Sequence, residues 1–189
     1  MIEFIAGLVL FFGIHSFSIY ALPLRDRLAA KSEYAWKGIY SVVSLVGLVL
    51  LIRGYGDMRL SATVFYVSPM WLRHVSALLL LPVFILFIAP YFPSRINRVM
   101  KHPQLVAVKL WALAHLLVNG SSADLMLFGA FLIWAVVDRI SVKRRPVREV
   151  PHIRESTANI VIVIVLGLGL YVAFALWLHG ALIGVKPFG

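Results

Sequence analysis

The sequence contains no cysteine and few charged residues. Without cysteine it cannot form disulfides, thiolate metal sites or c-type haem attachments, so any metal must be held by His, Asp, Glu or backbone groups. Charged residues make up 14% of the chain and hydrophobic residues 61%, against about 25% and about 45–50% in soluble domains. A soluble fold could not cover that much apolar surface, whereas lipid solvates it directly. The composition therefore predicts an integral membrane protein.

Six apolar segments approach the length of about 20 residues that a helix needs to cross a bilayer. They are Ile2–Leu22, Trp36–Ile52, Leu72–Phe92, Pro103–Asn119, Ala123–Val137 and Thr157–His179. The first segment lacks the basic start and the small-residue cleavage site of a signal peptide. We therefore expect it to be retained as the first membrane helix. Only residues 120–122 separate the fourth and fifth segments, which predicts a tight helical hairpin. We expect an all-α fold, a polytopic membrane helix bundle of about six transmembrane helices, formed by a single domain over residues 1–189.

Proline and glycine residues suggest where these helices end. Pro23 is expected to close the first helix, and Gly54 with Gly56 is expected to follow the second. Pro82 lies within the third apolar segment and predicts a kink there, whereas Pro103 suits the first turn of the fourth helix.

The net charge of +10 comes from basic residues that lie in the connections between apolar segments, not in a separate basic domain. We therefore exclude nucleic acid as a partner. Thirteen basic residues fall in the connections after the first, third and fifth segments, and four fall on the other side. The thirteen are Arg25, Arg27, Lys31, Lys37, Arg95, Arg98, Lys101, Arg139, Lys143, Arg144, Arg145, Arg148 and Arg154. Basic connections stay in the cytoplasm, so we expect both termini in the periplasm of a bacterial inner membrane.

Polar side chains within apolar segments are costly to bury in lipid and therefore suggest function. In the fourth segment Lys109 is embedded, and a period of 100° per residue places four residues on one face: Trp111, Ala112, His115 and Asn119. The small side chain at 112 would let a flat ligand approach the backbone beside the imidazole. His102 opens the same helix about 20 Å away, so it cannot share a metal with the histidine at 115.

His15 lies deep in the first segment and is a second candidate ligand. A single histidine within a membrane often only hydrogen-bonds to a neighbouring helix, as we expect for His74 and His179 near the interface. Two deep histidines on different helices instead favour a shared site, such as a bis-histidine haem. The depths of His15 and His115 differ by about 8 Å, and His102 is too shallow by a similar amount, so helix geometry does not choose between them as the partner of His15.

Several motifs resemble the NnrU-domain membrane proteins over nearly the whole chain. They are Gly13-Ile14-His15-Ser16, Leu24-Arg25, Lys101-His102-Pro103-Gln104, Lys109-Leu110-Trp111-Ala112-Leu113-Ala114-His115-Leu116 and Asn119-Gly120. That family is named for its association with nitric oxide and nitrite metabolism in denitrifying bacteria, and it includes the plant-type 15-cis-zeta-carotene isomerase.

The isomerase is a membrane enzyme with haem b and histidine ligands, which implies haem b here too. The shared helix face makes Trp111 and Ala112 candidate cofactor contacts. The resemblance implies His15 and His115 as candidate iron ligands. It implies His102 as a further essential histidine, and Lys109 and Asn119 join it as candidate catalytic residues. The isomerase has a cysteine near its second ligand, but residues 112–114 here are Ala-Leu-Ala, so thiolate ligation is excluded.

The implied chemistry is redox or isomerisation of a lipophilic or small-molecule substrate, with a membrane redox partner. Two other interpretations stay open. Lys101-His102-Pro103 before an apolar helix also resembles membrane methyltransferases of the isoprenylcysteine type, which use S-adenosylmethionine. However, the chain has only Glu149 and Glu155 near the expected position of their paired glutamates. The third interpretation is a haem-free accessory protein of a membrane reductase.

Overall fold

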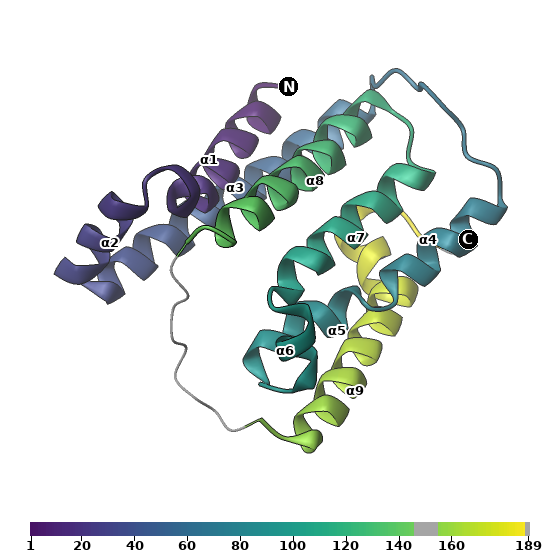
Figure 1. The fold of residues 1–189 in the computed structure, drawn as a ribbon. Helices are drawn as coiled ribbons and strands as arrows, with labels where there is room; N and C mark the ends of the chain where they lie inside the picture. The colour runs from purple at the N-terminus through teal and green to yellow at the C-terminus, as the bar shows by residue number, and fades with distance from the viewer. Residues whose placement is uncertain (146–154, 188–189) are drawn as a thin grey trace. The chain divides into compact units, whose positions relative to one another are not determined.

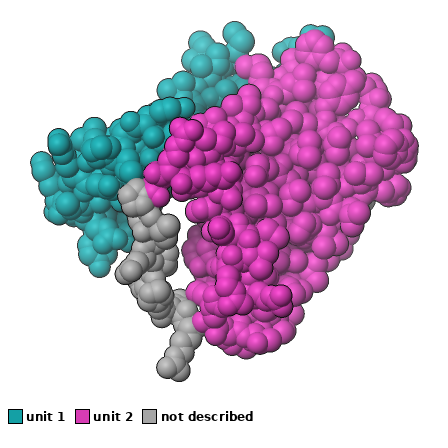
Figure 2. Space-filling view, viewed as in Figure 1, with its two compact units in different colours: residues 1–63 teal, residues 64–189 magenta. Residues whose placement is uncertain are grey.

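The computed structural model describes residues 1–145 and 155–187, and these residues are almost entirely helical (Figure 1). Among them there is no β-strand, only an isolated antiparallel bridge between Val64 and Ser121. The all-α class predicted from the sequence is therefore confirmed. The chain divides into two compact units, residues 1–63 and 64–189, where the sequence suggests one domain (Figure 2).

The first unit is a hairpin of two long helices with a short one between them. It consists of α1 (Ile2–Tyr20), α2 (Leu22–Lys31) and α3 (Glu33–Arg59). Pro23 lies in the first turn of α2, so it begins a helix as well as following the end of α1. The Ser32 hydroxyl caps α3 by accepting from the backbone N–H of Ala35.

Glycines allow α1 and α3 to approach closely. A Cβ added at Gly54 would lie 2.3 Å from the backbone nitrogen of Phe4, and one at Gly47 would lie 2.7 Å from that of Phe11. The expectation that Gly54 and Gly56 follow the second helix is wrong, because α3 continues to Arg59. Close packing of Gly54 against α1 offsets the low helix propensity of glycine.

The second unit contains nine helical elements within its described residues. They are α4 (Trp71–Leu80), α5 (Val83–Ile88), η1 (Ala89–Tyr91), α6 (Arg95–Met100), α7 (Pro103–Val118), α8 (Ser122–Val142), α9 (Thr157–Ala173), the π-helical turn η2 (Phe174–Leu178) and α10 (His179–Ile183). Pro82 separates α4 from α5, and Pro103 begins α7, as the sequence predicts. A short connection joins α7 to α8, which confirms the predicted hairpin.

Helix α7 is the centre of this unit, since it packs against α4, α5 and α8 (Figure 1). Its Ala107 joins Val83 and Leu86 in a buried apolar cluster. Helix α9 crosses α5 closely, because a Cβ added at Gly167 would lie 2.5 Å from the side chain of Ile85. These contacts fix α7, which carries most of the candidate site residues.

Helices of membrane-spanning length account for much of the described chain. Five are long and apolar enough, namely Ile2–Tyr20, Glu33–Arg59, Trp71–Tyr91, Ser122–Val142 and Thr157–Ile183, while Pro103–Val118 is a shorter apolar helix. The 16 residues of α7 rise about 24 Å, less than the hydrocarbon thickness of about 30 Å. Large apolar side chains face outward, as with Leu45, Ile133 and Val165 at 62%, 67% and 63% exposure. The chain is therefore a membrane protein.

Helix α8 continues to Val142, beyond the end of the apolar segment Ala123–Val137. Arg148 and Arg154, which belong to the thirteen basic residues, lie outside the described residues, as does Glu149.

Candidate functional site

His115 lies one turn from the end of α7, in a cluster of aromatic rings. Its ring stacks on Phe128 of α8 with 4.6 Å between centroids, and the ring of Trp111 lies 5.1 Å away. Trp111 also meets Phe128 and Phe131 edge-on, each at 5.1 Å. The aromatic neighbours give this imidazole an apolar environment, and the predicted proximity of Trp111 to His115 is observed.

One nitrogen of His115 is committed to the backbone. Nδ1 lies 2.8 Å from the carbonyl oxygen of Trp111. A carbonyl oxygen only accepts hydrogen bonds, so Nδ1 donates and the neutral imidazole keeps its lone pair on Nε2. This tautomer is the one that metal-ligating histidines commonly use.

His179 lies beside His115, although the sequence suggests only an interfacial position for it. The two ring centroids are 6.4 Å apart and the ring planes differ by 16°. Nδ1 of His179 donates to the carbonyl oxygen of Val185 over 2.6 Å. The pair could not be found from helix periodicity, because the two residues belong to α7 and α10, far apart in the chain.

An extended segment, residues 64–68, covers the end of α7 near His115. The hydroxyl of Tyr66 donates to the carbonyl oxygens of Leu116 and Asn119, the latter at 2.9 Å. Ser68 donates to the carbonyl of Leu117 over 2.5 Å. These side chains satisfy the terminal carbonyls of α7, which have no partner within the helix. Burial raises the pKa of Tyr66, with a smaller contribution from the charge of Asp124.

Asn119 and Asp124 stabilise the turn between α7 and α8. The Asn119 side chain donates to the carbonyl oxygen of His115 over 3.0 Å, so it caps the helix that it follows. Asp124 is buried and forms a capping box with Ser121, whose hydroxyl donates to it over 2.6 Å. The sequence predicts Asn119 as a candidate catalytic residue, and its observed contact is with the backbone carbonyl of His115.

His15 lies in the first unit, where it faces α3. Its ring stacks on Phe11 with 4.1 Å between centroids and lies 5.1 Å from the ring of Tyr40. Nδ1 donates to the carbonyl oxygen of Phe11 over 2.7 Å. His15 therefore has the same backbone-bonded Nδ1 as His115.

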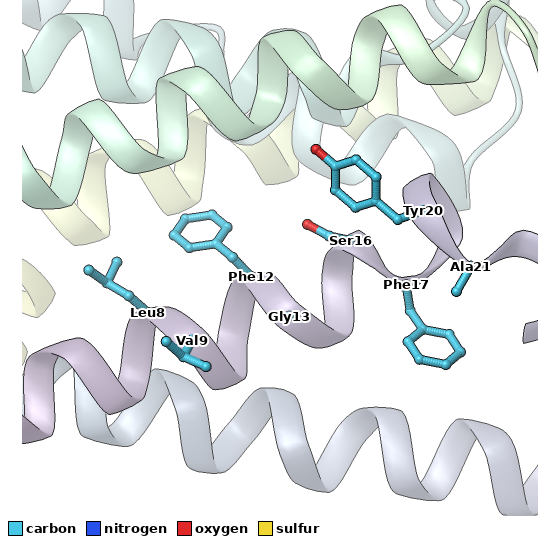
Figure 3. Close-up of a pocket in the computed structure, with 8 residues that line it drawn as sticks. All are labelled: Leu8, Val9, Phe12, Gly13, Ser16, Phe17, Tyr20 and Ala21. Atoms are coloured by element: carbon cyan, nitrogen blue, oxygen red, sulfur yellow. The ribbon is translucent and has the colours of Figure 1, made fainter.

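An open groove of about 400 Å³ runs along α1 (Figure 3). Apolar side chains such as Phe12 line it together with Gly13 and the hydroxyl-bearing Ser16 and Tyr20. His15 is not among the lining residues, so the groove does not expose this imidazole.

His102 lies at the opposite end of α7 from His115, as its N-cap residue. The pKa of His102 is lowered, chiefly by burial and further by the positive charge of Arg139, while Asp138 opposes the shift. Asp138 itself forms an ion pair with Arg145. His102 thus belongs to a basic cluster, and the rise along α7 of about 20 Å separates it from His115.

The remaining candidates on α7 differ in burial. Lys109 is half-buried, and no ion pair involves it in the part of the chain that the structure describes. Ala112 is fully buried at 0% exposure, so a flat ligand could touch it only after neighbouring side chains moved.

The available donors suit an iron porphyrin better than a bare metal ion. Within residues 1–145 and 155–187 no group of three or more His, Asp or Glu side chains could hold a metal ion. A structural zinc site usually needs four ligands from the protein, whereas haem supplies its own equatorial nitrogens and needs only axial ligands. Imidazoles with a backbone-bonded Nδ1 can supply such ligands, so the donor chemistry of these residues is compatible with haem.

Comparisons with known proteins agree with the motifs. No curated protein and no solved structure matches the chain. A family model described as NnrU protein matches residues 3–187, which include every candidate residue discussed above. The chain therefore belongs to the NnrU protein family.

Proposed function

We propose that this NnrU-family membrane protein binds haem b, with His115 as an axial iron ligand. The observation that carries the proposal is the hydrogen bond from Nδ1 of His115 to the carbonyl oxygen of Trp111, at 2.8 Å. It leaves Nε2 with the lone pair in a setting of aromatic rings, where a bound haem would displace little water. Two imidazoles are candidates for the second ligand: His15, which the family resemblance implies, and His179, which lies beside His115.

A bound haem would supply one-electron or Lewis-acid chemistry toward a small or lipophilic substrate. This chain would hold the iron through His115, fix the imidazole through the Trp111 carbonyl, and limit water through the rings of Phe128 and Phe131. The resemblance links this chemistry to nitric oxide or nitrite metabolism or to isomerisation. The basic environment of His102 suits contact with an anionic group, such as a substrate carboxylate.

We also propose that the protein lies in the bacterial inner membrane with both termini in the periplasm. The thirteen-to-four distribution of basic residues supports this orientation. Within the second unit, Arg98 forms an ion pair with Glu155 over 3.5 Å, and the charge of Arg139 acts on His102. The basic connections before α7 and after α8 therefore lie at the same end of this unit, as that orientation requires.

The test is a visible spectrum of the full-length protein, purified in detergent from haem-supplemented cells, oxidised and then reduced with dithionite. The expected result is a Soret band with α and β bands on reduction, and a marked loss of haem in His115→Ala. His102→Ala is the matched control on the same helix and should keep the wild-type spectrum. A wild type without haem when haem is abundant would refute the proposal. Binding of S-adenosylmethionine would then indicate a methyltransferase, and its absence an accessory protein.

A further inference from the structure

The connection between α3 and α4 is apolar and uncharged. No charged residue lies between Arg59 and Arg73, although connections that water surrounds are usually polar. Several of its large apolar side chains point away from the protein, since Phe65, Val67 and Met70 are 65%, 88% and 66% exposed. Contiguous exposed apolar side chains mark an interaction surface, because water solvates them poorly. The connection joins two helices of membrane-spanning length, so this surface lies at one face of the bilayer.

Segment 64–68 turns its polar groups toward α7 and its apolar side chains outward. The hydroxyl of Tyr66 donates to the carbonyl oxygen of Asn119 over 2.9 Å, and that of Ser68 donates to another carbonyl at the end of α7 over 2.5 Å. The backbone N–H of Phe65 donates to a carbonyl oxygen of the following turn over 2.8 Å. Successive side chains of an extended segment point in opposite directions, so Phe65 and Val67 face away from α7. The segment is therefore amphipathic and has a fixed orientation.

Helix α7 is too short to reach both faces of the bilayer. Its 16 residues rise about 24 Å, about 6 Å less than the hydrocarbon thickness of about 30 Å, and any tilt shortens its reach further. It begins after His102, beside the charges of Lys101 and Arg139, which require headgroups or water. The other end, which segment 64–68 covers, therefore stops short of the opposite headgroups. Lipid offers no hydrogen-bond donors there, so the last carbonyls of α7 need the donors that Tyr66 and Ser68 supply.

The residues that follow segment 64–68 limit how deep it lies. Trp71 begins α4 and is 61% exposed, and tryptophan and tyrosine gather where acyl chains meet headgroups. Arg73 is exposed in the first turn of α4, and its guanidinium must reach the headgroups, which its long side chain can do from just below them. Segment 64–68 therefore belongs at the boundary between acyl chains and headgroups, not at the bilayer centre.

We propose that segment 64–68 is a lipid-binding surface, inserted among the acyl chains just below the headgroups on the side opposite His102. Phe65 and Val67 contact the acyl chains, while Tyr66 and Ser68 close the end of α7 behind them. The segment thus completes a helix that is too short for the bilayer. The partner is the bilayer itself, and the inference does not depend on haem.

The experiment uses the absence of cysteine, because an introduced cysteine is then the only thiol in the chain. Val67→Cys is compared in lipid nanodiscs with Leu78→Cys, at a residue of α4 that is 70% exposed, and with Lys186→Cys, at an exposed charged residue near the C-terminus. The reagent is a charged, membrane-impermeant maleimide. Val67→Cys should react at least about tenfold more slowly than Lys186→Cys and about as slowly as Leu78→Cys, because the reactive thiolate is disfavoured among acyl chains. Equal rates for Val67→Cys and Lys186→Cys would overturn the inference.

A second measurement distinguishes lipid from protein as the cover of this surface. The same thiols are spin-labelled in detergent, and after reconstitution into nanodiscs the label reports collisions with oxygen, which concentrates among acyl chains, and with a water-soluble nickel chelate. Val67→Cys should show high accessibility to oxygen and low accessibility to nickel, as Leu78→Cys does. Nickel accessibility equal to that of Lys186→Cys would place the segment in water, and low accessibility to both would show that protein covers it. Either result refutes the inference.

Discussion

Replacing Gly120 with alanine tests whether the segment 64–68 holds the end of α7 in place. A Cβ at position 120 would lie 2.2 Å from the carbonyl oxygen of Tyr66 and 2.7 Å from its ring carbons. The first contact is with backbone, so the whole segment must shift. The shift would weaken the two hydrogen bonds from the Tyr66 hydroxyl to the carbonyl oxygens of Leu116 and Asn119. It would also weaken the hydrogen bond from the Phe65 backbone N–H to the Gly120 carbonyl oxygen, which is 2.8 Å long in the wild type.

The expected loss of stability combines two contributions. Overpacking of this kind costs about 1–3 kcal/mol, and each weakened hydrogen bond adds about 1 kcal/mol. A total of about 4–6 kcal/mol corresponds to a fall in melting temperature of roughly 8–24 °C for a chain of this size. Differential scanning fluorimetry in detergent measures it. Because Asn119 and His115 lie next to the affected turn, haem retention of the variant should fall in parallel.

Gly129→Ala is the matched control for this change. Gly129 lies inside α8, and a Cβ there would meet nothing within 4 Å. That variant should be neutral or stabilised by up to about 1 kcal/mol, since alanine favours helix over glycine. If Gly120→Ala melted at or above the temperature of Gly129→Ala, the packing of residues 64–68 on the turn would not matter as argued.

Three further predictions concern packing, pH and topology. Gly54→Ala should destabilise the protein by about 1–3 kcal/mol relative to Gly56→Ala, because only the first added Cβ meets Phe4, at 2.3 Å; equal melting temperatures would contradict this. The pKa of His102 is lower in the folded state than its unfolded value of 6.5, so folding favours the neutral imidazole. The stability that the neutral form contributes is fully present above pH 6.5 and is lost as the pH falls through the lower pKa of the folded state. Melting temperatures measured from pH 7.5 to pH 5 should therefore fall less in His102→Gln than in wild type, and identical slopes would exclude the effect. A C-terminal alkaline phosphatase fusion should be active and a fluorescent protein fusion dark, whereas the reverse pattern would place the C-terminus in the cytoplasm.

The sequence was most informative about the membrane helices. Each of the six apolar segments corresponds to a helical region, because lipid requires a long apolar stretch whose backbone groups bond within the helix. Helix ends were less predictable. The extension of α3 through Gly54 depends on Phe4 in another helix, and such a contact leaves no local signal. The π-turn before His179 was likewise not predictable from its apolar residues.

The sequence by itself determined the membrane setting, the all-α class, the charge asymmetry and the family motifs around His15, His102 and His115. These follow from composition, local spacing and linear pattern, which require no knowledge of what packs on what. Only the tertiary structure decided that Tyr66 bonds to the end of α7, that the charge of Arg139 acts on His102, and that His179 lies beside His115. Those relations join residues distant in the chain, and they depend on helix crossings and backbone turns that no single segment encodes.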